Sequence, residues 1–146
     1  MKYTINKINS GRDELILNYR NLNSEVEKII QFMQGNKVRL LGKVGEETVK
    51  LKPEDILYIE SVEDKVFAYT VNSVVKLDYT LIQLENLLNN IQYFRCSKSI
   101  IINIDKVEKL KSLPSNRIDA VMQGGYHIII SRKYASEFRR ILKGDN

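Results

Sequence analysis

The chain has few of the residues that build reactive or metal-binding sites: one cysteine, Cys96, one histidine, His127, and no tryptophan. One cysteine cannot form an intramolecular disulfide, and one cysteine with one histidine cannot supply the four ligands of a structural zinc site. No apolar run approaches the roughly 18 residues that a membrane span requires, and the first residues carry no signal-peptide core. We therefore expect a cytoplasmic protein without metal or cofactor, in which Cys96 is a buried small hydrophobic residue.

Patterns of catalytic residues are equally scarce. The sequence contains neither a glycine-rich phosphate loop nor a serine nucleophile elbow. His127 adjoins the apolar residues 128–130, a setting in which histidine is far more often structural than catalytic. The carboxylates between residues 54 and 64 occupy positions typical of solvated turns, whereas acid-base catalysis needs two carboxylates in different environments. The sequence therefore predicts a binding protein and no enzymatic activity.

Positive charge is concentrated towards the C-terminus. The chain is 146 residues long with a net charge of +5, and its 43% hydrophobic and 28% charged residues are typical of a globular protein. Residues 95–146 contain 11 Lys and Arg against 5 Asp and Glu, whereas residues 37–94 contain 7 against 9. A local surplus of this kind favours a polyanion as partner, although ordinary solvated surfaces can have the same composition.

The first 36 residues predict a small segment of two strands and a helix. Residues 2–8 and 13–20 alternate in the manner of strands, with a turn between them. Ser24 and Glu27 have the spacing of a capping box, and Gly35 is suited to end the helix that follows. The apolar stripe of this helix should pack on the chain itself or on a partner.

Residues 37–146 predict a domain that is mainly β with a few helices. Strands are expected at residues 38–44, 47–52, 56–60, 66–71, 74–77, 99–104, 117–122 and 126–130, the last two forming a hairpin around Gly124-Gly125. A capping box of Thr80 and Gln83 should begin a helix with apolar residues at 81, 84, 88 and 91 and an end at Asn89-Asn90. A last helix should run from an N-cap at Ser131 to about Lys143.

Two short segments combine basic and hydroxyl side chains beside well-patterned elements. Ser97, Lys98 and Ser99 are expected in the loop between the Leu81 helix and the buried strand, so that a rigid strand fixes a loop of hydrogen-bond donors. Arg132 and Lys133 fall in the first turn of the last helix, where the helix dipole disfavours cations. Either an anion compensates these charges or both side chains extend into water.

The order of motifs over roughly residues 36–142 resembles the LytTR DNA-binding family. The motifs are ILYIES at residues 56–61, TL at 80–81 with LE at 84–85 and Leu88, FR at 94–95 with KS at 98–99 and IN at 102–103, and Ile128, ISR at 130–132 and Tyr134. The resemblance implies an elongated stack of small antiparallel β-sheets whose loops enter successive major grooves of bent DNA. It matches Lys98 and Arg132 to the family's base-reading positions and the loop around Asp64-Lys65 to a third contact region.

The chemistry of Lys98 and Arg132 agrees with the assignment, whereas in the largely acidic loop at residues 60–65 only Lys65 could attract phosphate. Arg132 can grip the O6 and N7 atoms of guanine with two donors, and Lys98 can reach the same edge. Ser97, Lys133 and Lys65 are assigned to phosphate contacts. Relatives often carry His and then Arg or Asn where this chain has Ser97 and Lys98, which leaves the base preference of this loop open.

The resulting hypothesis is a sequence-specific regulator of transcription that binds double-stranded DNA at direct or inverted repeats. The 36 residues before the domain are too few for a phosphorylatable receiver domain, so the resemblance is closest to small stand-alone members. A homodimer and a regulatory membrane or signalling protein remain open as partners. The alternative is a protein-interaction module that controls such a partner without binding DNA, because the loop at residues 60–65 is acidic. Binding of single-stranded RNA would require stacking aromatic residues on an open sheet, and the tyrosines are scattered in the sequence.

Overall fold

The computed structural model describes residues 1–34, 38–88 and 92–144. The chain divides into two compact units, Met1–Lys37 and Val38–Asn146. The described helices include none that is both long and apolar enough to cross a membrane.

The first unit contains the helix α1 (Ser24–Met33), which begins one residue earlier than the sequence pattern predicts. Asn23 is the N-cap, with extended backbone, and its Oδ1 atom accepts a hydrogen bond of 2.9 Å from the backbone N–H of Val26. The predicted capping box of Ser24 and Glu27 is therefore wrong, because Asn23 is an equally strong capping residue and precedes Ser24. The predicted end at Gly35 lies outside the described residues.

The predicted N-terminal hairpin is also wrong, since the described residues before α1 contain no strand. Nearly all of residues 1–23 are exposed, including large apolar side chains such as Tyr3 and Ile5. An isolated two-stranded hairpin is at best marginally stable in water, and alternation alone cannot supply the apolar face against which it would pack.

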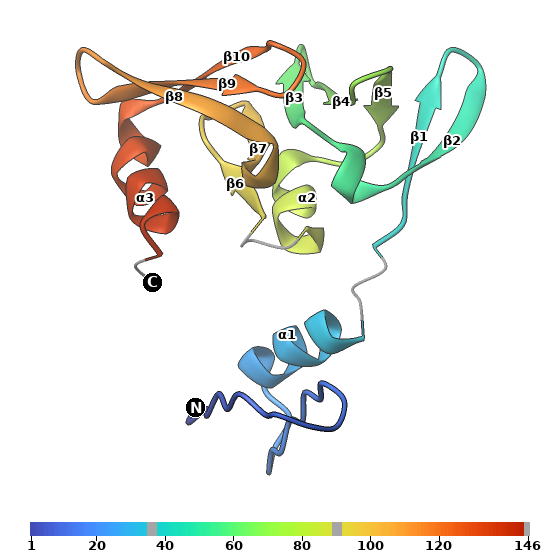
Figure 1. The fold of residues 1–146 in the computed structure, drawn as a ribbon. Helices are drawn as coiled ribbons and strands as arrows, with labels where there is room; N and C mark the ends of the chain where they lie inside the picture. Colours follow the sequence, from blue (N-terminus) through green and yellow to red (C-terminus); the bar gives the residue numbers. More distant parts are fainter. Residues whose placement is uncertain (35–37, 89–91, 145–146) are drawn as a thin grey trace. The chain divides into compact units, whose positions relative to one another are not determined.

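In the described part of the second unit, ten strands form two sheets in which every pairing is antiparallel. The strands are β1 (Leu40–Val44), β2 (Glu47–Leu51), β3 (Tyr58–Val62), β4 (Lys65–Tyr69), β5 (Val74–Leu77), β6 (Tyr93–Arg95), β7 (Ile100–Asn103), β8 (Val107–Leu113), β9 (Arg117–Met122) and β10 (His127–Ile130). The larger sheet has the order β2-β1-β5-β4-β3-β7-β6 and the smaller one β10-β9-β8. The mainly antiparallel β fold predicted from the sequence is thus confirmed, with one large and one small sheet (Figure 1).

Two helices complete the described part of this unit: α2 (Leu81–Leu87), which lies against β6 and β7, and α3 (Arg132–Leu142), which lies against β9 (Figure 1). The predicted capping box of α2 is confirmed, because Thr80 and Gln83 exchange side-chain to backbone hydrogen bonds of 3.1 and 2.9 Å. Its predicted end at Asn89-Asn90 and the apolar Ile91 lie outside the described residues. Short 3-10 turns, Pro53–Asp55 and Ile104–Lys106, precede β3 and β8.

The strands β3, β7 and β6 separate two hydrophobic cores, because their side chains alternate between the two faces of the large sheet. One core gathers Ile59, Ile101 and Tyr93 with the buried leucines of α2. The opposite core gathers Tyr58, Ile102 and Phe94 with buried residues of the small sheet and with Ala135 and Phe138 of α3. The two helices therefore pack into opposite cores, α2 on one face of the large sheet and α3, together with the small sheet, on the other.

Asn103, at the end of β7, is the one buried polar residue in the described core. Its Nδ2 atom donates to the carbonyl of Ile56 at 2.9 Å, and its Oδ1 atom accepts from the N–H of Asp105 at 3.1 Å. The backbone N–H of Asn103 donates to the carbonyl of Leu57 at 3.0 Å. These bonds satisfy the buried amide and fix β7 against the segment that leads into β3.

Candidate nucleic-acid interface

The first candidate segment, residues 96–99, is the loop of the β6–β7 hairpin. The sequence predicts it directly after the α2 helix, but β6 lies between them. The N–H of Cys96 donates to the carbonyl of Ile100 at 3.0 Å, which closes the loop, and the N–H of Ser99 donates to Oγ of Ser97 at 3.3 Å. Lys98 is exposed and Ser97 is half-buried, so the lysine projects from a short and well-bonded loop.

The prediction that Cys96 is a buried small hydrophobic residue is confirmed, because its side chain is fully buried in the core beside α3. Burial raises the pKa of the thiol to about 12. The Sγ atom lies 3.6 Å from the carbonyl oxygen of Ile100, to which it donates. A buried thiol of this kind is chemically inert and serves packing.

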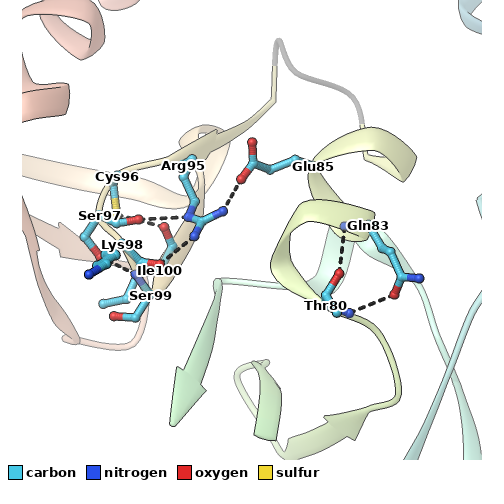
Figure 2. A network of polar contacts seen from close by, with 9 residues as sticks. All are labelled: Thr80, Gln83, Glu85, Arg95, Cys96, Ser97, Lys98, Ser99 and Ile100. Atoms are coloured by element: carbon cyan, nitrogen blue, oxygen red, sulfur yellow. Dashed lines mark hydrogen bonds and ion pairs between the residues drawn. The ribbon is translucent and has the colours of Figure 1, made fainter. Parts of the chain in front are cut away.

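Arg95 holds the loop from the side of α2 (Figure 2). Its Nε atom donates to the carbonyl of Ser97 at 2.9 Å, one terminal nitrogen donates to the carbonyl of Lys98, and the other pairs with the carboxylate of Glu85. The sequence pattern alone does not assign a role to Arg95 or Glu85. The available signal was one arginine between the apolar Phe94 and Cys96, where a charge requires a partner.

The second candidate segment is the first turn of α3. The N–H of Ser131 donates to the carbonyl of Cys96 at 3.0 Å, so the start of α3 lies directly beside the β6–β7 loop. Arg132 and Lys133 are exposed, and the Nζ atom of Lys133 lies 5.5 Å from the ring centroid of Tyr134. Ser131 precedes α3 as predicted, but its side chain caps no N–H among the described residues.

The third candidate segment is the β3–β4 turn. The sequence predicts a loop at residues 60–65, but the strands extend to a two-residue turn at Glu63 and Asp64, whose φ angles are 50° and 64°. Positive φ at both central residues is typical of the tight turns that match the twist of a hairpin. Lys65 is the first residue of β4 and is exposed. The N–H of Ser61 donates to the carbonyl of Ser99 at 2.8 Å, which joins this hairpin to the β6–β7 loop.

Two backbone hydrogen bonds, Ser61 to Ser99 and Ser131 to Cys96, thus bring the three predicted segments side by side. We call their exposed cations the basic cluster, which consists of Lys65, Lys98, Arg132 and Lys133. Exposed cations on adjoining segments form a local surplus of positive charge, which is suited to a polyanion. Glu63 and Asp64 bring negative charge to the Lys65 end of the cluster.

Other polar and aromatic groups have structural roles. Tyr58 and Tyr69 stack at a centroid distance of 4.4 Å, with Tyr126 5.6 Å from Tyr58, and burial raises the pKa of the Tyr58 hydroxyl to about 12. Because the Tyr58 and Tyr69 rings stack on one another, these two rings serve packing. The Nδ1 atom of His127 lies 3.0 Å from a carboxylate oxygen of Asp119. Within residues 1–34, 38–88 and 92–144, no group of three or more His, Cys, Asp or Glu residues is arranged to hold a metal ion.

Known proteins with similar sequences include sensory transduction proteins and a transcriptional regulator. The chain is 23% identical over 124 residues to the sensory transduction protein LytT of Bacillus subtilis, a match that covers 85% of this chain and 52% of LytT. It is 29% identical over 100 residues to LytT of Bacillus anthracis, which covers 68% of this chain and 41% of that protein. The chain therefore spans about half the length of these relatives or less. An uncharacterized HTH-type transcriptional regulator of Staphylococcus aureus is 27% identical over 123 residues, which is 83% of either protein.

The fold and the family agree. A LytTr DNA-binding domain from Bacillus cereus superposes with a TM-score of 0.69 at 23% sequence identity, covering 73% of this chain and 97% of that structure. The family model described as the LytTr DNA-binding domain matches residues 46–143, which include all four cations of the basic cluster. This family consists of DNA-binding domains and is not a class of enzymes. With its motifs, its fold and the matched residues in agreement, the chain belongs to the LytTr DNA-binding domain family.

Proposed function

We propose that this protein is a transcription regulator that binds double-stranded DNA at specific sequences and reads successive major grooves with loops of its β domain. In this proposal Lys98 and Arg132 contact base edges, and Ser97, Lys133 and Lys65 contact phosphates. Double-stranded DNA at direct or inverted repeats is the partner, with a second copy of the chain on the second repeat.

The observation that carries the proposal is the convergence of the two basic segments through the bond between Ser131 and Cys96, 3.0 Å long. Cations that are far apart in the sequence become neighbours on rigid elements, as recognition of a base edge requires. Lys98 lies on a loop bounded by two paired strands, and Arg132 lies on a helix whose buried face is anchored in the core. A nonspecific polyanion binder would not need this rigidity, because attraction to phosphates tolerates mobile side chains.

Selection of binding sites from random duplexes tests the proposal directly. We expect enriched duplexes to contain two short elements separated by about one helical turn or a small multiple, as two readers on one face of DNA require. Affinity for these sites should exceed affinity for random duplex and should fall as salt concentration rises. If selection yields no consensus and binding is no tighter than to a polyanion competitor, the proposed function is wrong.

Lys98→Ala tests the role of the β6–β7 loop. The variant should weaken binding to the best site by about 1–3 kcal/mol and relax the base preference at one position, because a base contact is lost. Competition titrations with single-base variants of the site measure both effects. A uniform loss on every sequence would instead identify Lys98 as a phosphate contact.

The acidic β3–β4 turn supports the alternative, a protein-interaction module that does not bind DNA. Glu63 and Asp64 are exposed beside Lys65, and they would repel phosphates at that end of the basic cluster. Replacing both by asparagine, which tolerates positive φ, should strengthen DNA binding if DNA approaches this end. Absence of DNA binding by both the wild-type protein and this variant would favour the alternative.

A further inference from the structure

The polar contacts of Arg95 connect the candidate interface to Glu85 on α2, which lies outside it (Figure 2). We propose that Arg95 and Glu85 are positioning residues that set the shape of the β6–β7 loop and thereby the sequence selectivity of the protein. Neither residue is assigned a contact with DNA. This inference rests on the proposed function, because it concerns how the base-reading loop is held.

The guanidinium group of Arg95 is suited to this role by its geometry. It carries five N–H donors in a rigid plane and no acceptor. Two of its nitrogens reach the carbonyls of Ser97 and Lys98, and the third pairs with Glu85, so every nitrogen is used. The side chain is only 20% exposed, which makes its partners necessary. Arg95 thus fixes two successive peptide units of the loop from which the Lys98 side chain projects.

Glu85 connects this loop to α2 and thereby to the core that this helix covers. Its helix, α2, is held at the N-terminus by the capping box of Thr80 and Gln83 and along its length by the buried Leu81 and Leu84. Glu85 follows Leu84 directly, and its side chain is 41% exposed, at the edge of that packed face. The packing of α2 therefore sets the backbone position of Glu85, and the ion pair with Arg95 connects this helix to the carbonyls of the loop.

The alternation of side chains along β6 directs Arg95 towards α2. Tyr93 and Arg95 are two residues apart in β6, so their side chains share a face of the sheet, and Tyr93 belongs to the core that α2 covers. Phe94, between them, points into the opposite core with α3. The alternation of one three-residue strand thus couples the loop to both helices, by a polar contact on one face and by apolar packing on the other.

The charge of Glu85 has a second consequence. Paired with Glu85, Arg95 contributes little net positive charge to the surface that faces DNA, so it adds little affinity that is independent of sequence. The clamp therefore favours selectivity, because it orders Lys98 without attracting phosphates. Loss of the carbonyl contacts and loss of the charge partner should then have different effects on DNA binding.

Arg95→Lys tests the carbonyl contacts, because lysine keeps the charge but cannot span two carbonyls and a carboxylate in one plane. We expect the ratio of affinities for the selected site and for random duplex to fall about tenfold, while the affinity for random duplex stays the same. Thermal unfolding and the far-UV spectrum should show that the variant is folded. An unchanged affinity ratio in a folded variant would overturn the proposal.

Glu85→Gln tests the charge partner. Arg95 keeps its carbonyl contacts in this variant, but its charge is no longer balanced. Affinity for random duplex should rise, and the plot of log affinity against log salt should become steeper by up to about one. Glu108→Gln, an exposed change of the same charge on β8, is the matched control. An equal rise in the control would show that total charge, and not the pairing of Arg95, is responsible, which would contradict the proposal.

The double variant Glu85→Arg with Arg95→Glu separates an ion pair from a clamp. It can restore a salt bridge between α2 and β6, but a glutamate at position 95 has no donor for the two carbonyls. Selectivity should therefore stay as low as in Arg95→Lys. Recovery of wild-type selectivity would overturn the role that we assign to the carbonyl contacts.

A measurement without DNA distinguishes failure of this inference from failure of the proposed function. NMR order parameters of the amides of residues 97–99 should fall in Arg95→Lys and remain high in the Glu108→Gln control. Unchanged order parameters would overturn the clamp, whether or not the protein selects a DNA sequence. A wild-type protein with an ordered loop and no sequence preference would contradict the proposed function instead.

Discussion

The β6–β7 loop and the first turn of α3 carry similar side chains, but different forces hold them in place. The loop is fixed by three hydrogen bonds to backbone carbonyl groups. The N–H of Cys96 donates to Ile100, and the Arg95 side chain donates to Ser97 and Lys98. The first turn of α3 is fixed by apolar packing further along the helix, where Ala135 and Phe138 are fully buried. The ring centroids of Phe138 and Phe94 lie 5.4 Å apart. One hydrogen bond, between Ser131 and Cys96, connects the two regions.

This difference indicates how each region should respond to substitution. Apolar packing contributes strongly to global stability, so damage to the support of α3 should destabilise the whole second unit. Each hydrogen bond contributes only about 1 kcal/mol net, so damage to the loop should change local order and binding more than stability. The predictions below test this contrast, beginning with the largest expected effect.

Phe138→Ala should lower the free energy of unfolding by about 3–5 kcal/mol, because it leaves a cavity in the core between α3 and the two sheets. Chemical denaturation measures this loss. Glu137→Ala, an exposed change at the neighbouring position, is the control and should stay within about 0.5 kcal/mol of the wild type. A loss below about 1 kcal/mol for Phe138→Ala would mean that packing does not anchor α3.

Ser131→Pro should break the connection between the two regions. The φ angle of Ser131 is −70°, which proline can adopt, but proline lacks the N–H that donates to Cys96 and places its ring against that carbonyl. We expect a loss of about 1–3 kcal/mol in stability and a loss of selectivity for the DNA site. Ser131→Ala keeps the N–H and should be nearly neutral. Equal behaviour of the two variants would show that the backbone bond is unimportant.

Arg132→Ala should weaken binding to the selected site by about 1–3 kcal/mol and leave stability unchanged or slightly raised. The reason is that a cation in the first turn of a helix opposes the helix dipole in the free protein. Binding titrations and chemical denaturation on the same samples measure both quantities. Destabilisation by more than about 2 kcal/mol would instead identify Arg132 as a structural partner.

Lys133→Ala should have the smallest effect, a similar loss of affinity on all sequences with a salt dependence reduced by about one charge. Its contact with the ring of Tyr134 is exposed, so stability should change by less than about 1 kcal/mol. Titrations over a range of salt concentrations on selected and random duplexes measure this effect. A change of base preference would show that Lys133 takes part in reading the sequence.

Much of the fold could be predicted because the relevant signals are local. Strict alternation predicts β1 to β5, and the paired Gly124 and Gly125, both with positive φ, mark the β9–β10 turn. The capping box of Thr80 and Gln83 depends on two residues that are close in the sequence. The strand β8 was missed because it is an exposed edge strand in which charged residues replace the alternation, and β6 was missed because it has only three residues.

The arrangement of the candidate interface could be predicted only in part. Basic side chains at Lys98 and Arg132 are visible in the sequence, but their proximity depends on a backbone bond between residues 96 and 131, which no sequence pattern records. The contacts of Arg95 with backbone carbonyls are hidden for the same reason, since carbonyls are present at every position. The predicted N-terminal hairpin is wrong because the alternation of its apolar and polar residues is not accompanied by an apolar surface on which the strands could be buried.

The strand order of the large sheet also has a consequence for folding. Pairs such as β1 with β2 and β3 with β4 join neighbouring hairpin strands, whereas β3 with β7 joins Tyr58 to Ile102 across the intervening hairpins and α2. Closing so long a stretch of chain costs more entropy, so this pairing should form late. The β6–β7 loop meets Ser61 only after it has formed. If the proposed function is correct, an incompletely folded chain would carry the positive charges, but only the finished sheet would align them for reading a DNA sequence.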